Sequence, residues 1–194
     1  IDGHFILRGV ASIYKSFCFI ALLSIIFLAA CSDSFEYDNE DVVAIVRGEE
    51  ITIGEIRFLY PDDKVLNNIE DTVKTELIVQ EAKRMNLDVS KEIEETIQAM
   101  GDYPPEDVDT PSAESIRTFA EPQAKKLGME PKEYYEAYIE KTTEMNAYVN
   151  QYIYEVLGEP DPELGIDEYN EMVNHYIEHL IELNNDDIQI FINP

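Results

Sequence analysis

The sequence is short of positive charge. Its 194 residues include 14 lysines and arginines against 41 aspartates and glutamates, which gives a formal net charge of −27 at pH 7. Recognition of phosphate groups needs lysine and arginine, so we expect no binding to nucleic acid, or to anionic lipid through a basic patch. The acidic balance favours cationic or unfolded partners. The alternative is that the charge only keeps the protein soluble.

Cysteine is scarce, and the usual motifs of catalysis are missing. The two cysteines are Cys18 and Cys31. Cys18 lies in an apolar run that we interpret below as part of a cleaved signal peptide, so no disulfide is expected in the mature chain. There is no G-x-S-x-G elbow and no glycine-rich phosphate loop. Nucleophilic catalysis thus has little support, and we expect neither a cofactor nor enzymatic activity.

The longest apolar run is too short to cross a bilayer. Residues 17 to 30 read FCFIALLSIIFLAA, with Arg8 and Lys15 ahead of them. A transmembrane helix needs roughly 20 apolar residues, whereas a positive flank, a shorter apolar run and small residues before a cut are typical of a signal peptide. We predict a signal peptide over residues 1 to 30. Because the chain opens with isoleucine and not methionine, residues 1 to 14 are assigned no structural role, and whether they are translated stays open.

The residues around Cys31 indicate a lipid anchor. Leu28-Ala29-Ala30-Cys31 resembles the lipobox of bacterial lipoprotein precursors, in which the cysteine is acylated and becomes the first mature residue. The two chains of a diacylglycerol satisfy the requirement for stable anchoring. The resemblance implies a protein held through Cys31 on the extracytoplasmic face of the bacterial cell membrane, with residues 31–41 as an acidic tether. The alternative is an ordinary secretory signal with a cysteine nearby.

Residues 42–194 predict a mainly α-helical domain with a small two-stranded sheet. Val42–Val46 is a β-branched run that ends at Arg47-Gly48, which is typical of a short buried strand and a tight turn. The segment Ile188–Ile192 alternates isoleucine with other residues, as a half-buried strand does. We expect these two strands to pair and so to join the two ends of the mature chain.

Helices are predicted between the strands from apolar residues spaced three and four apart and from capping residues. Thr52 and Glu55 form a capping box for a short helix that stops before Pro61. The further helices are expected from Lys64 to Met85, from Ser90 as a cap to about Met100, from Ser112 to Leu127 with a kink or restart at Pro122, from Pro131 to Leu157, and from Ile166 to about Leu183.

The order of these elements resembles the N-terminal chaperone domain of the SurA and PrsA families, exported foldases that hold unfolded chains. VVAIVRGEEIT (42–52), ELIVQEAKRMNLDVS (76–90) and LGMEPKEYYEAYI (127–139) carry the resemblance. Arg47 departs from the family, which usually has asparagine before this glycine, a residue that tolerates a left-handed backbone better. Those foldases also carry a parvulin-type isomerase domain after the last strand. This sequence ends there, at Pro194, so we expect no prolyl isomerase activity from it.

The resemblance implies a cleft between helices that holds unfolded or extended polypeptide without chemistry. Methionine and tyrosine suit that task, because methionine adapts to many partners and tyrosine offers contact area at a low cost in entropy. The helix from Pro131 to Leu157 is rich in tyrosine, and a place in the core is the alternative for each of them. The candidate client-binding residues are Tyr134, Tyr135, Tyr138, Met145, Tyr148 and Tyr152.

Other functions stay open. The same fold could be an interaction module for one envelope partner, and a homodimer could complete the cleft. HYIEH, residues 175 to 179, matches the H-x-x-E-H zinc motif, in which His175 and His179 would share a helical face with Glu178 as general base. A zinc-dependent hydrolase needs a further acidic ligand, and Glu182 is the nearest carboxylate on that face. A plain exposed helix or adventitious metal binding explains the motif as well, so no metal ligand is assigned.

Overall fold

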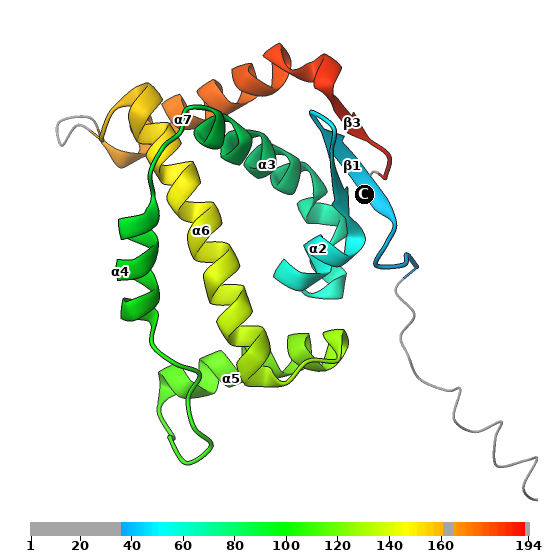
Figure 1. Cartoon of the computed structure of the whole chain (residues 1–194), viewed down its shortest axis with the longest axis vertical. Helices are drawn as coiled ribbons and strands as arrows, with labels where there is room; N and C mark the ends of the chain where they lie inside the picture. The colour runs from blue at the N-terminus through cyan, green and yellow to red at the C-terminus, as the bar shows by residue number, and fades with distance from the viewer. Residues whose placement is uncertain (1–35, 161–164, 193–194) are drawn as a thin grey trace, which may run out of the picture. The chain divides into compact units, whose positions relative to one another are not determined.

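The computed structural model describes residues 36–160 and 165–192, which form six helices and a small sheet (Figure 1). The predicted signal peptide and Cys31 lie outside the described residues. No helix within the described ranges has both the length and the apolar character needed to cross a membrane. The elements are β1 (Val42–Val46), β2 (Glu49–Thr52), α2 (Ile53–Leu59), α3 (Ile69–Arg84), α4 (Ser90–Met100), α5 (Pro111–Leu127), α6 (Pro131–Leu157), α7 (Ile166–Leu183) and β3 (Ile188–Ile190).

The sheet has three strands in the order β2-β1-β3, and both outer strands run antiparallel to β1. The predicted pairing of the two chain ends is confirmed, with Ala44 opposite Ile190. The prediction of only two strands is wrong, because β2 pairs with β1 across the Arg47-Gly48 turn. Its sequence, EEIT, has one apolar residue and so gives no alternating signal. The last strand also ends at Ile190, before the predicted Ile192.

Several predicted helix boundaries are confirmed, including both ends of α6 and of α7. The capping box of α2 is present, since the Thr52 backbone N–H donates to Glu55 Oε2 at 2.8 Å and the Glu55 N–H donates to Thr52 Oγ1 at 3.3 Å. Gly128 ends α5 in the left-handed conformation that glycine adopts without cost (φ 68°).

Three helix predictions are wrong in detail. α3 begins at Ile69 and not at Lys64, because the residues ahead of it form two short 3-10 turns. Ser90 is the first residue of α4 and does not cap it through its side chain. α5 begins one residue before the predicted Ser112, with the Thr110 hydroxyl accepting from the Ala113 N–H at 3.2 Å, and it continues through Pro122 without a restart.

α6 is the central helix of the described body, with α3, α4 and α5 all packed against it (Figure 1). β1 lies on α3, and the core between the sheet, α2 and α3 contains fully buried side chains such as Val43, Ile56 and Leu77. Each such side chain contributes about 1.5–3 kcal/mol through burial. α4 contributes no fully buried side chain, so it covers α6 without being part of the core.

Ordered contacts begin within the segment that the sequence suggests as a tether. The Ile53 N–H donates to the Asp41 carbonyl oxygen at 2.9 Å, and the Gly54 N–H donates to that of Asn39 at 2.8 Å. A Cβ atom on Gly54 would lie 2.9 Å from the Asn39 oxygen, so only glycine fits there. The last residues of this segment are therefore fixed to the start of α2.

Candidate functional site

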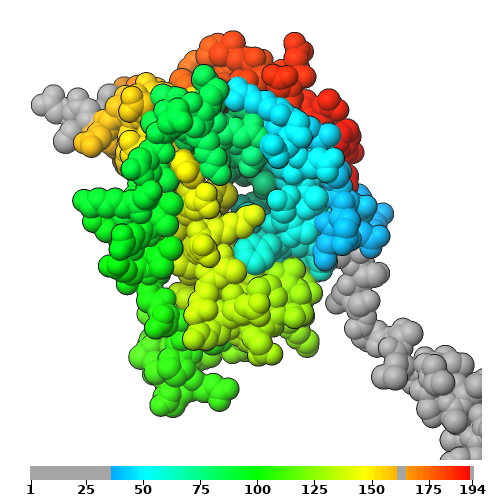
Figure 2. All heavy atoms as spheres, in the orientation of Figure 1, coloured from blue at the N-terminus to red at the C-terminus, as the bar shows by residue number. Residues whose placement is uncertain are grey.

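A cleft of about 240 Å³ opens between β2, α3 and α6. Figure 2 shows it as a hollow between the yellow surface of α6 and the cyan surface of the hairpin and α2. Water occupies roughly 30 Å³ per molecule in the liquid, so the space corresponds to about eight waters. It has room for a few side chains of a bound polypeptide.

Apolar side chains enter the cleft from every wall. The apolar side chains that β2, α2 and α3 contribute are buried. The two that α6 contributes, Met145 and Tyr148, are only half-buried. Methionine and tyrosine on α6 thus offer adaptable contact area that is still accessible. The apolar lining consists of Ile51, Leu59, Val79, Met145 and Tyr148.

The rim of the cleft is strongly acidic, with five glutamates and two lysines. Lys83 is already engaged: its Nζ lies 3.5 Å from Glu144 Oε1 and 5.1 Å from the centroid of the Tyr148 ring. A carboxylate and an aromatic face together are a favourable setting for a cation. Within the described residues, the exposed side chains of Glu49 and Glu50 have no hydrogen-bond or ion-pair partner.

β2 meets the cleft by its free edge. Successive side chains of a strand point to opposite faces of the sheet. Three successive residues, Glu49, Glu50 and Ile51, nevertheless all line the cleft, so the cleft lies at the edge of β2 and not over one face. Val46 and Glu49 flank the two-residue turn as a hydrogen-bonded pair, so the next residue, Glu50, directs its N–H and C=O away from β1. Among the residues that the structure describes, no strand pairs with β2 on that side.

Three of the predicted client-binding tyrosines lie in the core. Tyr134, Tyr135 and Tyr152 have exposed fractions of 0%, 6% and 2%. The Tyr134 hydroxyl donates to the Phe58 carbonyl oxygen at 3.0 Å, and burial raises the pKa of Tyr134 to about 12. The Tyr152 hydroxyl lies 2.9 Å from that of Tyr176. Buried in this way, the three side chains are not available to a client, and the core alternative holds for them.

The other three candidates divide between two places. Tyr138 is half-buried in an aromatic cluster with Tyr134, Phe58 and Phe119, and its ring centroid lies 4.8 Å from that of Phe119 in an edge-on arrangement. Met145 and Tyr148 line the cleft. The structure thus brings Met145 and Tyr148 together with residues of β2 and α3. The sequence pattern does not reveal that β2 and α3 contribute to the site.

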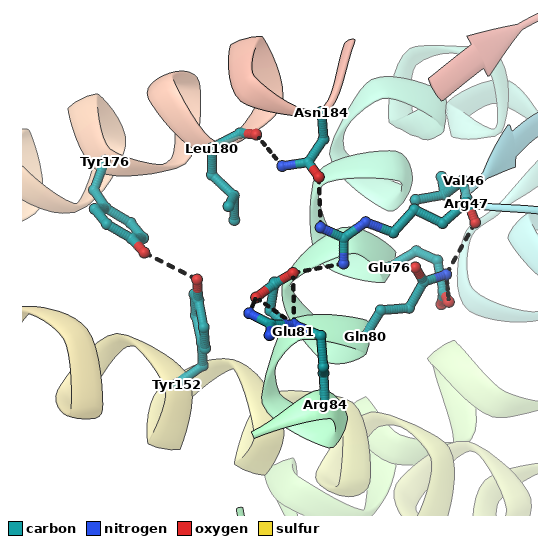
Figure 3. A network of polar contacts seen from close by, with 10 residues as sticks. All are labelled: Val46, Arg47, Glu76, Gln80, Glu81, Arg84, Tyr152, Tyr176, Leu180 and Asn184. Carbon is teal, nitrogen blue, oxygen red and sulfur yellow. Dashed lines mark hydrogen bonds and ion pairs between the residues drawn. The ribbon is translucent and has the colours of Figure 1, made fainter. Parts of the chain in front are cut away.

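A polar network around the buried Glu81 joins the hairpin turn, α3 and the end of α7 (Figure 3). Glu81, 5% exposed, forms ion pairs with Arg47 and Arg84, and the Arg47 guanidinium also donates to Asn184 Oδ1. Arg47 holds a left-handed backbone (φ 50°), which costs about 1–2 kcal/mol outside glycine. Its contacts offset that cost and explain how arginine is accommodated in this turn.

The network makes the fold sensitive to acid. Hydrogen bonds from Arg84 and Arg47 hold the pKa of Glu81 below its usual value, against the opposing effect of burial. A lowered folded-state pKa stabilises the fold above the unfolded pKa of about 4.3, and the contribution is lost as the pH falls through the folded value. We expect the urea midpoint to drop between about pH 5 and pH 3, and to drop less in Glu81→Gln. If the urea midpoint fell equally with pH in the parent and in Glu81→Gln, this role of Glu81 would be contradicted.

The two histidines of HYIEH are exposed on α7. His179 Nδ1 lies 3.9 Å from Glu182 Oε2. Within residues 36–160 and 165–192, no three histidine, cysteine, aspartate or glutamate side chains are arranged to hold a metal ion.

Comparisons with known proteins find no relative of this chain. No family model matches the chain, and it matches no curated protein and no solved structure. The described residues define a class: a mainly helical protein with a small three-stranded antiparallel sheet and an acidic cleft beside the free edge of that sheet.

Proposed function

We propose that this protein is a chaperone-like holdase that binds unfolded or extended polypeptide in the cleft, without chemistry and without isomerase activity. The observation that carries the proposal is an open cleft that combines apolar side chains with a free strand edge. Apolar contact is non-directional, and a strand edge binds the backbone common to all sequences. The resemblance of most of residues 42–154 to the chaperone domain of the SurA and PrsA families supports it.

Unrelated, permanently unfolded polypeptides should bind the purified mature protein with micromolar affinity, as measured by fluorescence anisotropy. The variant Met145→Ser/Tyr148→Ser should weaken binding about tenfold, equivalent to about 1.4 kcal/mol, because it removes the accessible apolar area of α6. Tyr154→Ser is the matched control, since Tyr154 is 43% exposed on the same helix and does not line the cleft. Unchanged affinity in the double variant would contradict the proposal.

The second candidate is an interaction module for a single envelope partner. The small volume and the charged rim of the cleft favour it, since both features select among ligands. A well-folded protein that binds none of the unfolded polypeptides would point to this function, and crosslinking in cells would then identify the partner.

The proposed site of action is the extracytoplasmic face of the membrane, through lipid on Cys31. The Leu-Ala-Ala-Cys sequence after an apolar run supports it. Expressed in bacteria, the protein should partition into the detergent phase and carry the mass of a diacylglycerol at Cys31, and Cys31→Ser should abolish both. Detergent partitioning that survives in Cys31→Ser would show that another segment anchors the chain.

A further inference from the structure

We infer that the cleft selects extended segments that carry lysine or arginine, and that such a segment adds as a strand to the free edge of β2. The inference rests on the proposed function and specifies the class of polypeptide bound. Three features of the cleft carry it: the exposed backbone of β2, the unpaired acidic side chains beside that backbone, and the way in which the cleft already holds a cation.

The strand edge determines how the segment lies. Glu50 directs its N–H and C=O toward the side of β2 where the described part of the chain places no strand. A segment laid along this edge can exchange two backbone hydrogen bonds with Glu50 and direct alternate side chains into the cleft. A folded helix offers no free backbone groups for this exchange, so the ligand is an extended chain.

The charge of the rim determines which segments are preferred. Glu49 and Glu50 lie on the edge strand itself, and within the described residues their carboxylates have no partner. An added strand places its side chains about 5 Å from those of β2, where opposite charges attract and like charges repel. Lysine or arginine opposite these glutamates is therefore favoured, and aspartate or glutamate is disfavoured.

Lys83 shows how the cleft holds a cation. Its ammonium group lies between the Glu144 carboxylate and the face of the Tyr148 ring, bridging α3 and α6. These two groups would suit a ligand's lysine or arginine equally well. Lys83 thus competes with a cationic ligand, and its removal should strengthen binding of that ligand.

Peptides of about six residues, the usual length of a strand, test the inference by fluorescence anisotropy at about 0.1 M salt. One alternates lysine with valine, a second alternates glutamate with valine, and a third repeats the first with N-methylated amides that cannot donate hydrogen bonds. The lysine peptide should bind at least tenfold more tightly than either of the others. Equal binding of the lysine and glutamate peptides, or of the lysine and methylated peptides, would overturn the inference.

Variants separate local recognition from attraction to the whole acidic protein. Glu49→Gln/Glu50→Gln should weaken lysine-peptide binding about fivefold, whereas Lys83→Ala should strengthen it severalfold. Glu155→Gln/Glu171→Gln is the matched control, because it removes the same charge from exposed positions outside the cleft. Equal losses in the two glutamine variants, or weaker binding in Lys83→Ala, would contradict the inference.

The two proposals fail in different ways. Binding of unfolded polypeptides without preference for lysine over glutamate would overturn the inference and leave the holdase function standing. If a well-folded protein bound neither the unfolded polypeptides nor the lysine peptide, the holdase function and the inference would both be overturned. Circular dichroism of each variant confirms the fold before affinities are compared.

Discussion

Replacing Tyr134 with alanine is expected to lower the free energy of unfolding by about 3–5 kcal/mol, the usual cost of removing a large buried aromatic side chain. Tyr134 is fully buried, and its ring centroid lies 5.3 Å from that of Phe58 and 6.0 Å from that of Phe119. The substitution leaves a cavity at the junction of α2, α5 and α6. Urea denaturation followed by circular dichroism measures the change.

Two control substitutions separate packing from the hydroxyl group and from helix propensity. Tyr134→Phe keeps the ring and loses the hydrogen bond to the Phe58 carbonyl oxygen, so it should cost only about 1 kcal/mol. Tyr154→Ala removes an exposed tyrosine from the same helix and should stay within about 0.5 kcal/mol of the parent. A loss below about 1 kcal/mol in Tyr134→Ala would show that this aromatic cluster does not hold the helices together.

Glu81→Ala is the second large effect that we expect, a loss of about 2–3 kcal/mol. Breaking a fully buried ion pair costs about 3–5 kcal/mol because it leaves a buried charge uncompensated. The cost here is smaller because Arg47, with 27% of its side chain exposed, can partly reach water. The hairpin turn and the end of α7 should loosen together, since Glu81 holds Arg47 and Arg47 holds Asn184.

Substitutions at Arg47 separate the network from the turn. Arg47→Ala loses the ion pair and keeps the strained backbone, whereas Arg47→Gly loses the same pair and relieves the strain at φ 50°. The glycine variant should therefore be more stable than the alanine variant by about 1 kcal/mol. Equal stability of the two would show that the strain at this turn is no larger than the extra conformational entropy that glycine loses on folding.

Much of the helical part of the fold follows from local signals. Apolar residues spaced three and four apart mark one face of a helix, and Pro131, Gly128 and the Thr52–Glu55 box mark helix ends. These signals act within one or two turns, so one sequence suffices to read them. The start of α3 is missed because 3-10 turns continue the apolar spacing ahead of Ile69 without being part of the helix.

The sheet is only partly predictable because its pairing is not local. The β-branched run Val42–Val46 is a strong signal and is confirmed as β1. β2 has one buried side chain, Ile51, because its remaining residues face the solvent and the cleft, and a strand of that kind has no hydrophobic alternation to detect. The turn before it is held by Glu81 and Asn184, which come from distant parts of the sequence.

The site shows the same division between local and distant information. The richness of α6 in tyrosine could be read from the sequence, but not which faces of that helix are covered. α3, α4 and α5 cover most of them, so Tyr134, Tyr135 and Tyr152 are buried and Met145 and Tyr148 line the cleft. The acidic wall of β2 could not be assigned to a site without knowing that the hairpin lies opposite α6.

Site-specific photocrosslinking tests the central claim, that extended polypeptide binds in this cleft, most directly. A photoreactive amino acid replaces Met145, which lines the cleft, or Ile97, which is 37% exposed on α4 outside it. Each protein is irradiated with a labelled, permanently unfolded polypeptide. Our account predicts strong crosslinking from position 145 and little from position 97. Equal crosslinking from both positions, or none from position 145 while the polypeptide still binds, would contradict it.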